Sequence, residues 1–90
     1  MSKRILIIDD EIDLLDVLKR FFEKNEYEVL TASNGVEALK RISENPDIIL
    51  LDINLPDTDG ITICGKIREM ISCPILFLTS RNSDSGKIMG

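Results

Sequence analysis

The stretch Asp47-Ile48-Ile49-Leu50-Leu51-Asp52 decides the fold that this sequence predicts. Four apolar residues in succession lead into a single carboxylate, that of Asp52. A run this short and this apolar is typical of a strand buried on both faces, as in a parallel sheet covered by helices. Asp52 then lies at the carboxyl end of its strand, which is where ligands bind in open α/β sheets.

The composition is that of one small globular domain. The chain has 90 residues, of which 43% are hydrophobic and 30% are charged, and its formal net charge is −5. A chain of this length forms one domain, and the acidic balance argues against nucleic-acid binding by this segment. No apolar run approaches the length of a membrane helix, and no signal peptide opens the sequence. We therefore expect no membrane partner and a cytoplasmic location.

The sequence has two cysteines, Cys64 and Cys73, and no histidine. A zinc site built from cysteine and histidine is therefore excluded. Since no secretory signal is present, we expect two partly buried thiols rather than a disulfide.

Further apolar runs alternate with helical patterns on both sides of the opening stretch. We expect strands at about 4–9, 28–32, 47–52 and 74–79, and helices at about 11–24, 35–45, 60–71 and 83–90. The second strand has polar flanks, which are typical of an edge strand. Asn34, followed by Glu37 three residues later, resembles a capping box at the start of the second helix.

This alternation predicts a parallel sheet with right-handed crossovers. We expect an α/β fold, a flavodoxin-like doubly wound sheet with the strand order 2-1-3-4. The first and third strands are neighbours in that order, so Asp9, Asp10 and Asp52 converge where the strand order reverses. One of the first two acids is also expected to cap the helix that follows.

Three carboxylates at one edge of a sheet repel one another, and a bound divalent cation is the simplest way to hold them together ionised. Oxygen ligands with few protein anchors suit Mg²⁺, which keeps several waters and recruits a phosphate oxygen. A carboxylate is also a nucleophile toward phosphorus, so the cluster has the parts that phosphoryl transfer needs. The hydroxyl of Thr79, at the end of the fourth strand, could hydrogen-bond the new phosphoryl group.

Taken together, these motifs resemble a response-regulator receiver domain of two-component signalling. The matching stretches cover almost the whole chain: Ile7 to Glu11, Asp47 to Asp52, Asn54 to Pro56, Asp59-Gly60, and Pro74 to Ser80. The resemblance implies that Asp52 is the phospho-acceptor, that Asp9 and Asp10 hold Mg²⁺ with it, and that Thr79 is the switch hydroxyl. It also implies that the backbone carbonyl of Asn54 is a metal ligand. The phosphoryl donor would be a phosphohistidine on a sensor histidine kinase, and no turnover on an external substrate is expected.

The family's sheet has five strands, and its fifth strand carries a lysine that contacts the phosphoryl group. This sequence supplies four strands, and Lys87 lies in the expected fourth helix with no apolar strand before it. We therefore expect a single partial receiver domain over 1–90, without the fifth strand and the last helix. Two consequences are expected to follow: self-association through the open strand 75–78, and phosphorylation of Asp52 that is slow or absent.

Three other interpretations of function stay open. The first is an aspartate-nucleophile phosphohydrolase, although that class places a second acid where this chain has Asn54. The second is an interaction-only module that self-associates through its fourth strand. The third is flavin binding, which the fold alone suggests and the acids at the first strand end disfavour. A calcium loop over 55–60 is discarded because Lys66 stands where its bidentate glutamate should be.

Overall fold

A computed structural model describes residues 3–78 of the chain. Strands and helices alternate within these residues: β1 (Arg4–Ile8), α1 (Ile12–Lys24), β2 (Glu28–Ala32), α2 (Gly35–Ile42), β3 (Ile48–Asp52), α3 (Gly60–Met70) and β4 (Ile75–Leu78). The strands pair in parallel in the order β2-β1-β3-β4. The expected fold class and strand order are confirmed. The expected helix over 83–90 lies outside the described residues.

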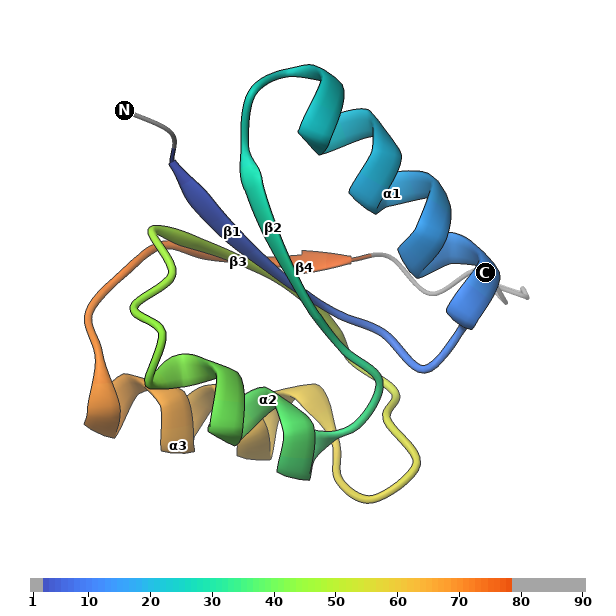
Figure 1. The fold of residues 1–90 in the computed structure, drawn as a ribbon. Coiled ribbons are helices and arrows are strands. Elements are labelled where there is room, and N and C mark those ends of the chain that lie inside the picture. The colour runs from blue at the N-terminus through green and yellow to red at the C-terminus, as the bar shows by residue number, and fades with distance from the viewer. Residues whose placement is uncertain (1–2, 79–90) are drawn as a thin grey trace.

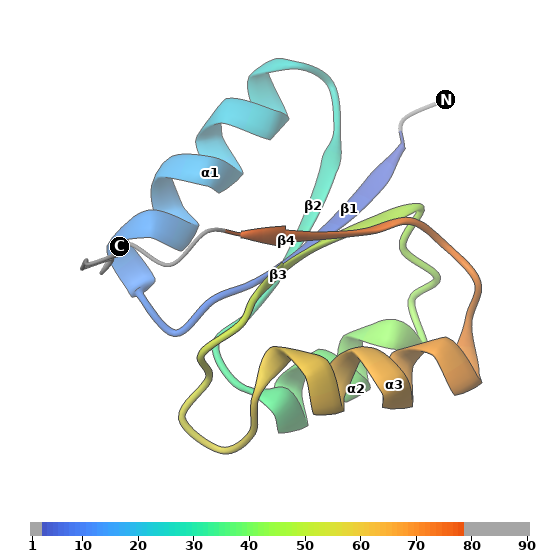
Figure 2. The same ribbon diagram turned by 180° about the vertical axis from the view of Figure 1, so that it is seen from behind.

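The helices form two layers around the sheet. α1 covers one face, and α2 and α3 lie side by side on the other face (Figures 1 and 2). This arrangement is what right-handed crossovers between parallel strands produce when the chain winds in both directions from a central strand. Over the described part of the chain, no helix is long and apolar enough to cross a bilayer.

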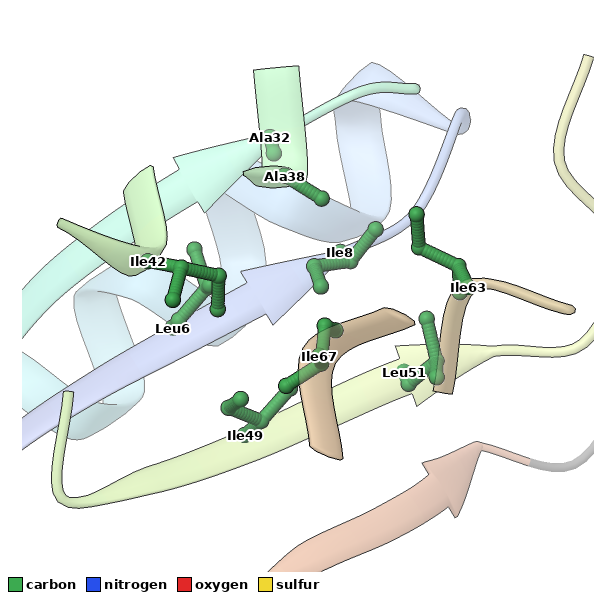
Figure 3. Packing of buried hydrophobic residues seen from close by; sticks show 9 residues of the cluster. All are labelled: Leu6, Ile8, Ala32, Ala38, Ile42, Ile49, Leu51, Ile63 and Ile67. Carbon is green, nitrogen blue, oxygen red and sulfur yellow. The ribbon is translucent and has the colours of Figure 1, made fainter. Parts of the chain in front are cut away.

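The core is built around the two central strands, β1 and β3, each of which is buried over its last four residues. Successive side chains of a strand point to opposite faces of the sheet. Leu6 and Ile8 therefore pack on the side of α2 and α3, whereas Ile5 and Ile7 pack on the side of α1. Figure 3 shows the larger cluster, which consists of Leu6, Ile8, Ala32, Ala38, Ile42, Ile49, Leu51, Ile63 and Ile67.

Two helix ends differ from the sequence-based expectation. α2 ends at Ile42 rather than near residue 45, because Asn45 adopts a left-handed backbone conformation with a φ of 55° before Pro46. The N-cap residue of α1 is Glu11, not Asp9 or Asp10 as expected. Asp9 instead accepts a hydrogen bond through Oδ1 from the backbone N–H of Glu11, at 2.9 Å. The side chain of Asp9 thus shapes the turn that leads into α1, from two positions before the N-cap residue.

The two outer strands have different surfaces. β2 lies at one end of the sheet, as its polar flanks predict. β4 lies at the other end and pairs, among the strands that the structure describes, with β3 alone. Leu76 is 52% exposed and Phe77 is 43% exposed. The apolar run 75–78 therefore forms the expected strand, but its position at the end of the order leaves two large side chains at the surface.

Candidate functional site

The pairing of β1 with β3 places two acids side by side. Ile8 pairs with Leu51, so Asp9, the residue after β1, lies level with Asp52, the last residue of β3. Both side chains are buried, with exposures of 1% for Asp9 and 0% for Asp52. The backbone N–H of Asp9 also donates to the carbonyl of Ala32 at the end of β2, at 3.0 Å. Backbone pairing among three strands thus fixes where the two buried acids meet.

Asp10 completes a group of three carboxylates, here called the acid cluster (Asp9, Asp10 and Asp52). One carboxylate oxygen from each residue lies within 4.8 Å of the other two. Asp10 is exposed, so the cluster combines two buried acids with one at the surface. The structure therefore brings together the three acids that the sequence predicted would converge.

The loop after β3 donates a backbone hydrogen bond to the acid cluster. The backbone N–H of Asn54 donates to Oδ1 of Asp52, at 3.3 Å. Asn54 also forms an isolated antiparallel bridge with Asp59, further along the same loop. On the other side of β3, Asp52 pairs with Leu78 of β4. The remaining predicted site residue, Thr79, lies outside the described residues.

The donor atoms of the acid cluster fit a small divalent cation. They are all carboxylate oxygens, and Mg²⁺ prefers oxygen ligands and binds through few carboxylates together with water. Three carboxylates this close together, two of them buried, form a group of oxygen ligands that suits a divalent cation. Asp9, Asp10 and Asp52 are the residues that would hold such an ion.

Two helices that begin beside the site have side-chain caps. Oδ1 of Asn34 accepts from the N–H of Glu37 at 2.8 Å, as a capping box requires. The carboxylate of Glu37 accepts from the N–H of Ser33 at 3.0 Å, and not from that of Asn34 as a capping box would have it. Asp59 caps α3 by accepting from the N–H of Thr62 at 2.7 Å. The hydrogen bond from Ser33 lowers the pKa of Glu37, and the one from Thr62 lowers the pKa of Asp59.

A contact that sequence reasoning missed joins the loop after β3 to α2. Asp57 accepts hydrogen bonds from the backbone N–H of Gly35 at 2.8 Å and from that of Val36 at 3.2 Å. The bond from Gly35 is the main reason that the pKa of Asp57 lies below its usual value. In the sequence, Asp57 reads as a turn residue after a proline. Nothing local to it signals a partner more than 20 residues away. An aspartate directly before a helix is a recognisable N-cap signal. The role of Asp59 could therefore be predicted from the sequence, whereas the role of Asp57 could not.

Comparison with known sequences places the chain in a family. The sequence model of the response regulator receiver domain matches residues 5–89. The alkaline phosphatase synthesis transcriptional regulatory protein PhoP of Bacillus subtilis is 42% identical over 92 residues, which cover 100% of this chain and 38% of that protein. The chain thus spans well under half the length of this relative.

Comparison with solved structures agrees with the sequence match. A two-component response regulator from Clostridium difficile is 38% identical, with a TM-score of 0.82, over 91% of this chain and 71% of that one. The response regulator TrrA from Thermotoga maritima, solved in complex with Mg²⁺-BeF, is 36% identical, with a TM-score of 0.78, over 93% and 76%. A CheY-like receiver domain from Methylobacillus flagellatus, 23% identical over 97% and 77% with a TM-score of 0.83, shares the fold. The chain belongs to the response regulator receiver domain family of two-component signalling.

Proposed function

We propose that the chain accepts a phosphoryl group on Asp52 and acts as the phosphorylation switch of a two-component response regulator. The observation that carries this proposal is the acid cluster, in which the carboxylate oxygens of Asp9, Asp10 and Asp52 lie within 4.8 Å of one another. Membership of the receiver domain family supports the phospho-accepting role. The relative TrrA, solved with Mg²⁺-BeF, supports the choice of Mg²⁺ as the cofactor.

The proposed chemistry is in-line phosphoryl transfer to a carboxylate. A carboxylate oxygen of Asp52 attacks the phosphorus of a phosphohistidine on a sensor histidine kinase. An O–P bond forms as the P–N bond breaks, and the imidazole leaves with the electron pair of that bond and takes up a proton. Mg²⁺, held by the acid cluster and the backbone carbonyl of Asn54, would supply positive charge against the phosphoryl oxygens. The hydroxyl of Thr79 is proposed to hydrogen-bond the phosphoryl group once it is in place.

The partner and the location are proposed for this 90-residue segment alone and not for a longer protein. We assign a sensor histidine kinase as the partner, a cytoplasmic location, and no turnover on an external substrate. PhoP is named as a transcriptional regulatory protein, and this chain spans 38% of it. We place no nucleic-acid contact on this segment, because its net charge is −5 and DNA repels an acidic surface.

A finer proposal concerns the outer edge of the sheet at β4, which pairs with β3 alone among the strands that the structure describes. Leu76 and Phe77 of β4 are exposed, and an apolar edge strand of this kind is a template for pairing with another chain. We propose that a second copy pairs there.

The test is an intact-mass spectrum after incubation with a small acyl phosphate and Mg²⁺. We expect a gain of one phosphoryl group that disappears when Mg²⁺ is chelated or when Asp52→Asn is used. Asp47→Asn is the matched control, because Asp47 precedes the same strand at its opposite end and lies far from the acid cluster in the pairing. A gain that survives Asp52→Asn, or no gain in protein that is folded by circular dichroism, would refute the proposal. A phosphatase assay on a generic phosphomonoester separates the switch from a phosphohydrolase.

A further inference from the structure

The loop between β3 and α3, residues 53–59, is folded like a small hairpin. At its base, the backbone N–H of Gly60 donates to the carbonyl of Ile53, at 2.6 Å. Closer to its tip, the N–H of Leu55 donates to the carbonyl of Thr58, at 3.2 Å. Asn54 stands between these two hydrogen bonds, on the arm that continues β3. The two arms approach so closely at the base that a Cβ built on Gly60 would lie 2.7 Å from Cα of Ile53, so this position requires glycine.

The tip of this loop is tied to the start of α2, which lies beside it in Figures 1 and 2. The two carboxylate oxygens of Asp57 accept from two successive N–H groups, those of Gly35 at 2.8 Å and Val36 at 3.2 Å. The loop approaches α2 so closely that a Cβ built on Gly35 would lie 2.7 Å from Cγ2 of Thr58, and the Thr58 side chain would have to move to make room for it. The first N–H groups of a helix have no partner within it and attract a negative charge. Asp57 therefore serves as a cap that α2 receives from another part of the chain.

We propose that Asp57 is a positioning residue for the metal site. By holding the tip of the loop on α2, it fixes the backbone of Asn54 beside Asp52, so that the Asn54 carbonyl is available to the ion held by the acid cluster. Asn54 is then restrained on both sides, because its own N–H donates to Oδ1 of Asp52 at 3.3 Å. The inference rests on the proposed function, since it assigns a role toward the Mg²⁺ of that site.

The affinity for Mg²⁺ distinguishes a role of Asp57 in positioning from a role in stability alone. Residues that orient metal ligands typically change metal affinity by 10- to 100-fold when they are removed. Since Asp57 acts on one backbone ligand among several, we expect the lower end of this range, a Kd for Mg²⁺ that is about tenfold higher in Asp57→Ala. Asn34→Ala is the matched control, because Asn34 also bonds the first turn of α2 but belongs to α2's own cap and not to the loop.

The experiment titrates the 90-residue chain and its variants with Mg²⁺ alone by calorimetry, and also measures amide hydrogen exchange without metal. In Asp57→Ala we expect the higher Kd together with faster exchange at Leu55 and Gly60. In Asn34→Ala we expect the wild-type Kd, with faster exchange confined to α2. Asp57→Asn keeps the shape of the side chain and one acceptor oxygen, so its Kd should fall between those of the wild type and Asp57→Ala. This variant also carries the test if Asp57→Ala does not fold.

An unchanged Kd in both Asp57 variants, or an equal rise in Asp57→Ala and Asn34→Ala, would overturn the inference while leaving Asp52-dependent Mg²⁺ binding in place. Binding by the wild type that survives Asp52→Asn, or no binding at all, would instead remove the proposed function, and the positioning role with it. The two failures are thus distinguished by the behaviour of the Asp52 variant.

Discussion

β3 and β4 are adjacent parallel strands of similar composition that lie in opposite surroundings. β3 runs between β1 and β4 and is buried over its last four residues, whereas the two middle residues of β4 are exposed. Each run of apolar residues correctly marks a strand. Burial, however, depends on how many neighbours the strand has and on which helices cover it. The difference teaches that the same apolar signal carries very different energetic weight at the centre of the sheet and at its end.

The largest expected effect comes from truncating one leucine in each strand. Leu51→Ala in β3 removes a fully buried side chain, and we expect it to lower the free energy of unfolding by about 3 kcal/mol, a value typical of a cavity in a core. Leu76→Ala in β4 removes a side chain that is 52% exposed and should lower it by less than about 1 kcal/mol. Urea denaturation of both variants measures the contrast. Equal losses in free energy would show that Leu76 is buried in solution, and would contradict the difference in burial between β3 and β4.

Mg²⁺ is expected to stabilise the folded chain and to slow hydrogen exchange more in β3 than in β4. At a concentration about 100 times its Kd, a ligand that binds only the folded state raises the free energy of unfolding by about 2.7 kcal/mol. Thermal denaturation with Mg²⁺ and with a chelator measures this gain. Hydrogen exchange should slow at Asp52 more than at Ile75, which pairs with Ile49, three positions before Asp52 in β3. A gain of the same size in Asp52→Asn would show that the ion binds elsewhere.

A charge on β4 should weaken the proposed association between copies. Lysine on an edge strand opposes pairing with another strand, so we expect Phe77→Lys to lower the association constant about tenfold, or by about 1.4 kcal/mol. Sedimentation equilibrium over a concentration series measures it. Ile61→Lys is the control, since Ile61 is also an exposed apolar residue but lies on α3. A wild-type chain that stays monomeric at high concentration would show that β4 does not pair with a second copy.

The smallest expected effect lies outside both strands, at the start of α2. The pKa of Glu37 is lowered from its usual 4.5, chiefly by the hydrogen bond from the N–H of Ser33. A lowered pKa means that the carboxylate stabilises the fold above its usual pKa, and that this contribution is lost as the pH falls through the lower, folded-state value. The difference in stability between the wild type and Glu37→Gln should therefore be constant from neutral pH down to about pH 5 and shrink below it. Urea denaturation across this range measures it, and a difference that grows in acid would contradict the assignment.

The elements and the residues of the acid cluster were predictable from the sequence because both depend on local signals. Periodicity marked the strands and helices, and the pair Asp9-Asp10 and the single Asp52 each follow an apolar run. The strand order was predictable because alternating strands and helices favour a doubly wound topology. The tie between Asp57 and α2 was not predictable, because it joins segments that approach each other only in the folded chain. The capping-box spacing correctly placed the bond from Glu37 to Asn34, but spacing alone could not show that the Glu37 carboxylate accepts from the N–H of Ser33 rather than from that of Asn34.

The pairing of β1 with β3 also bears on the order in which the molecule folds. Where this pairing begins, the backbone N–H of Arg4 donates to Asp47, which is 43 residues away in the sequence. Contacts of such long range form slowly, because the intervening chain loses its entropy before they are made. The segments between them, α1, β2 and α2, can take shape earlier. We therefore expect Asp9, Asp10 and Asp52 to come together late, when the pairing of β1 with β3 closes.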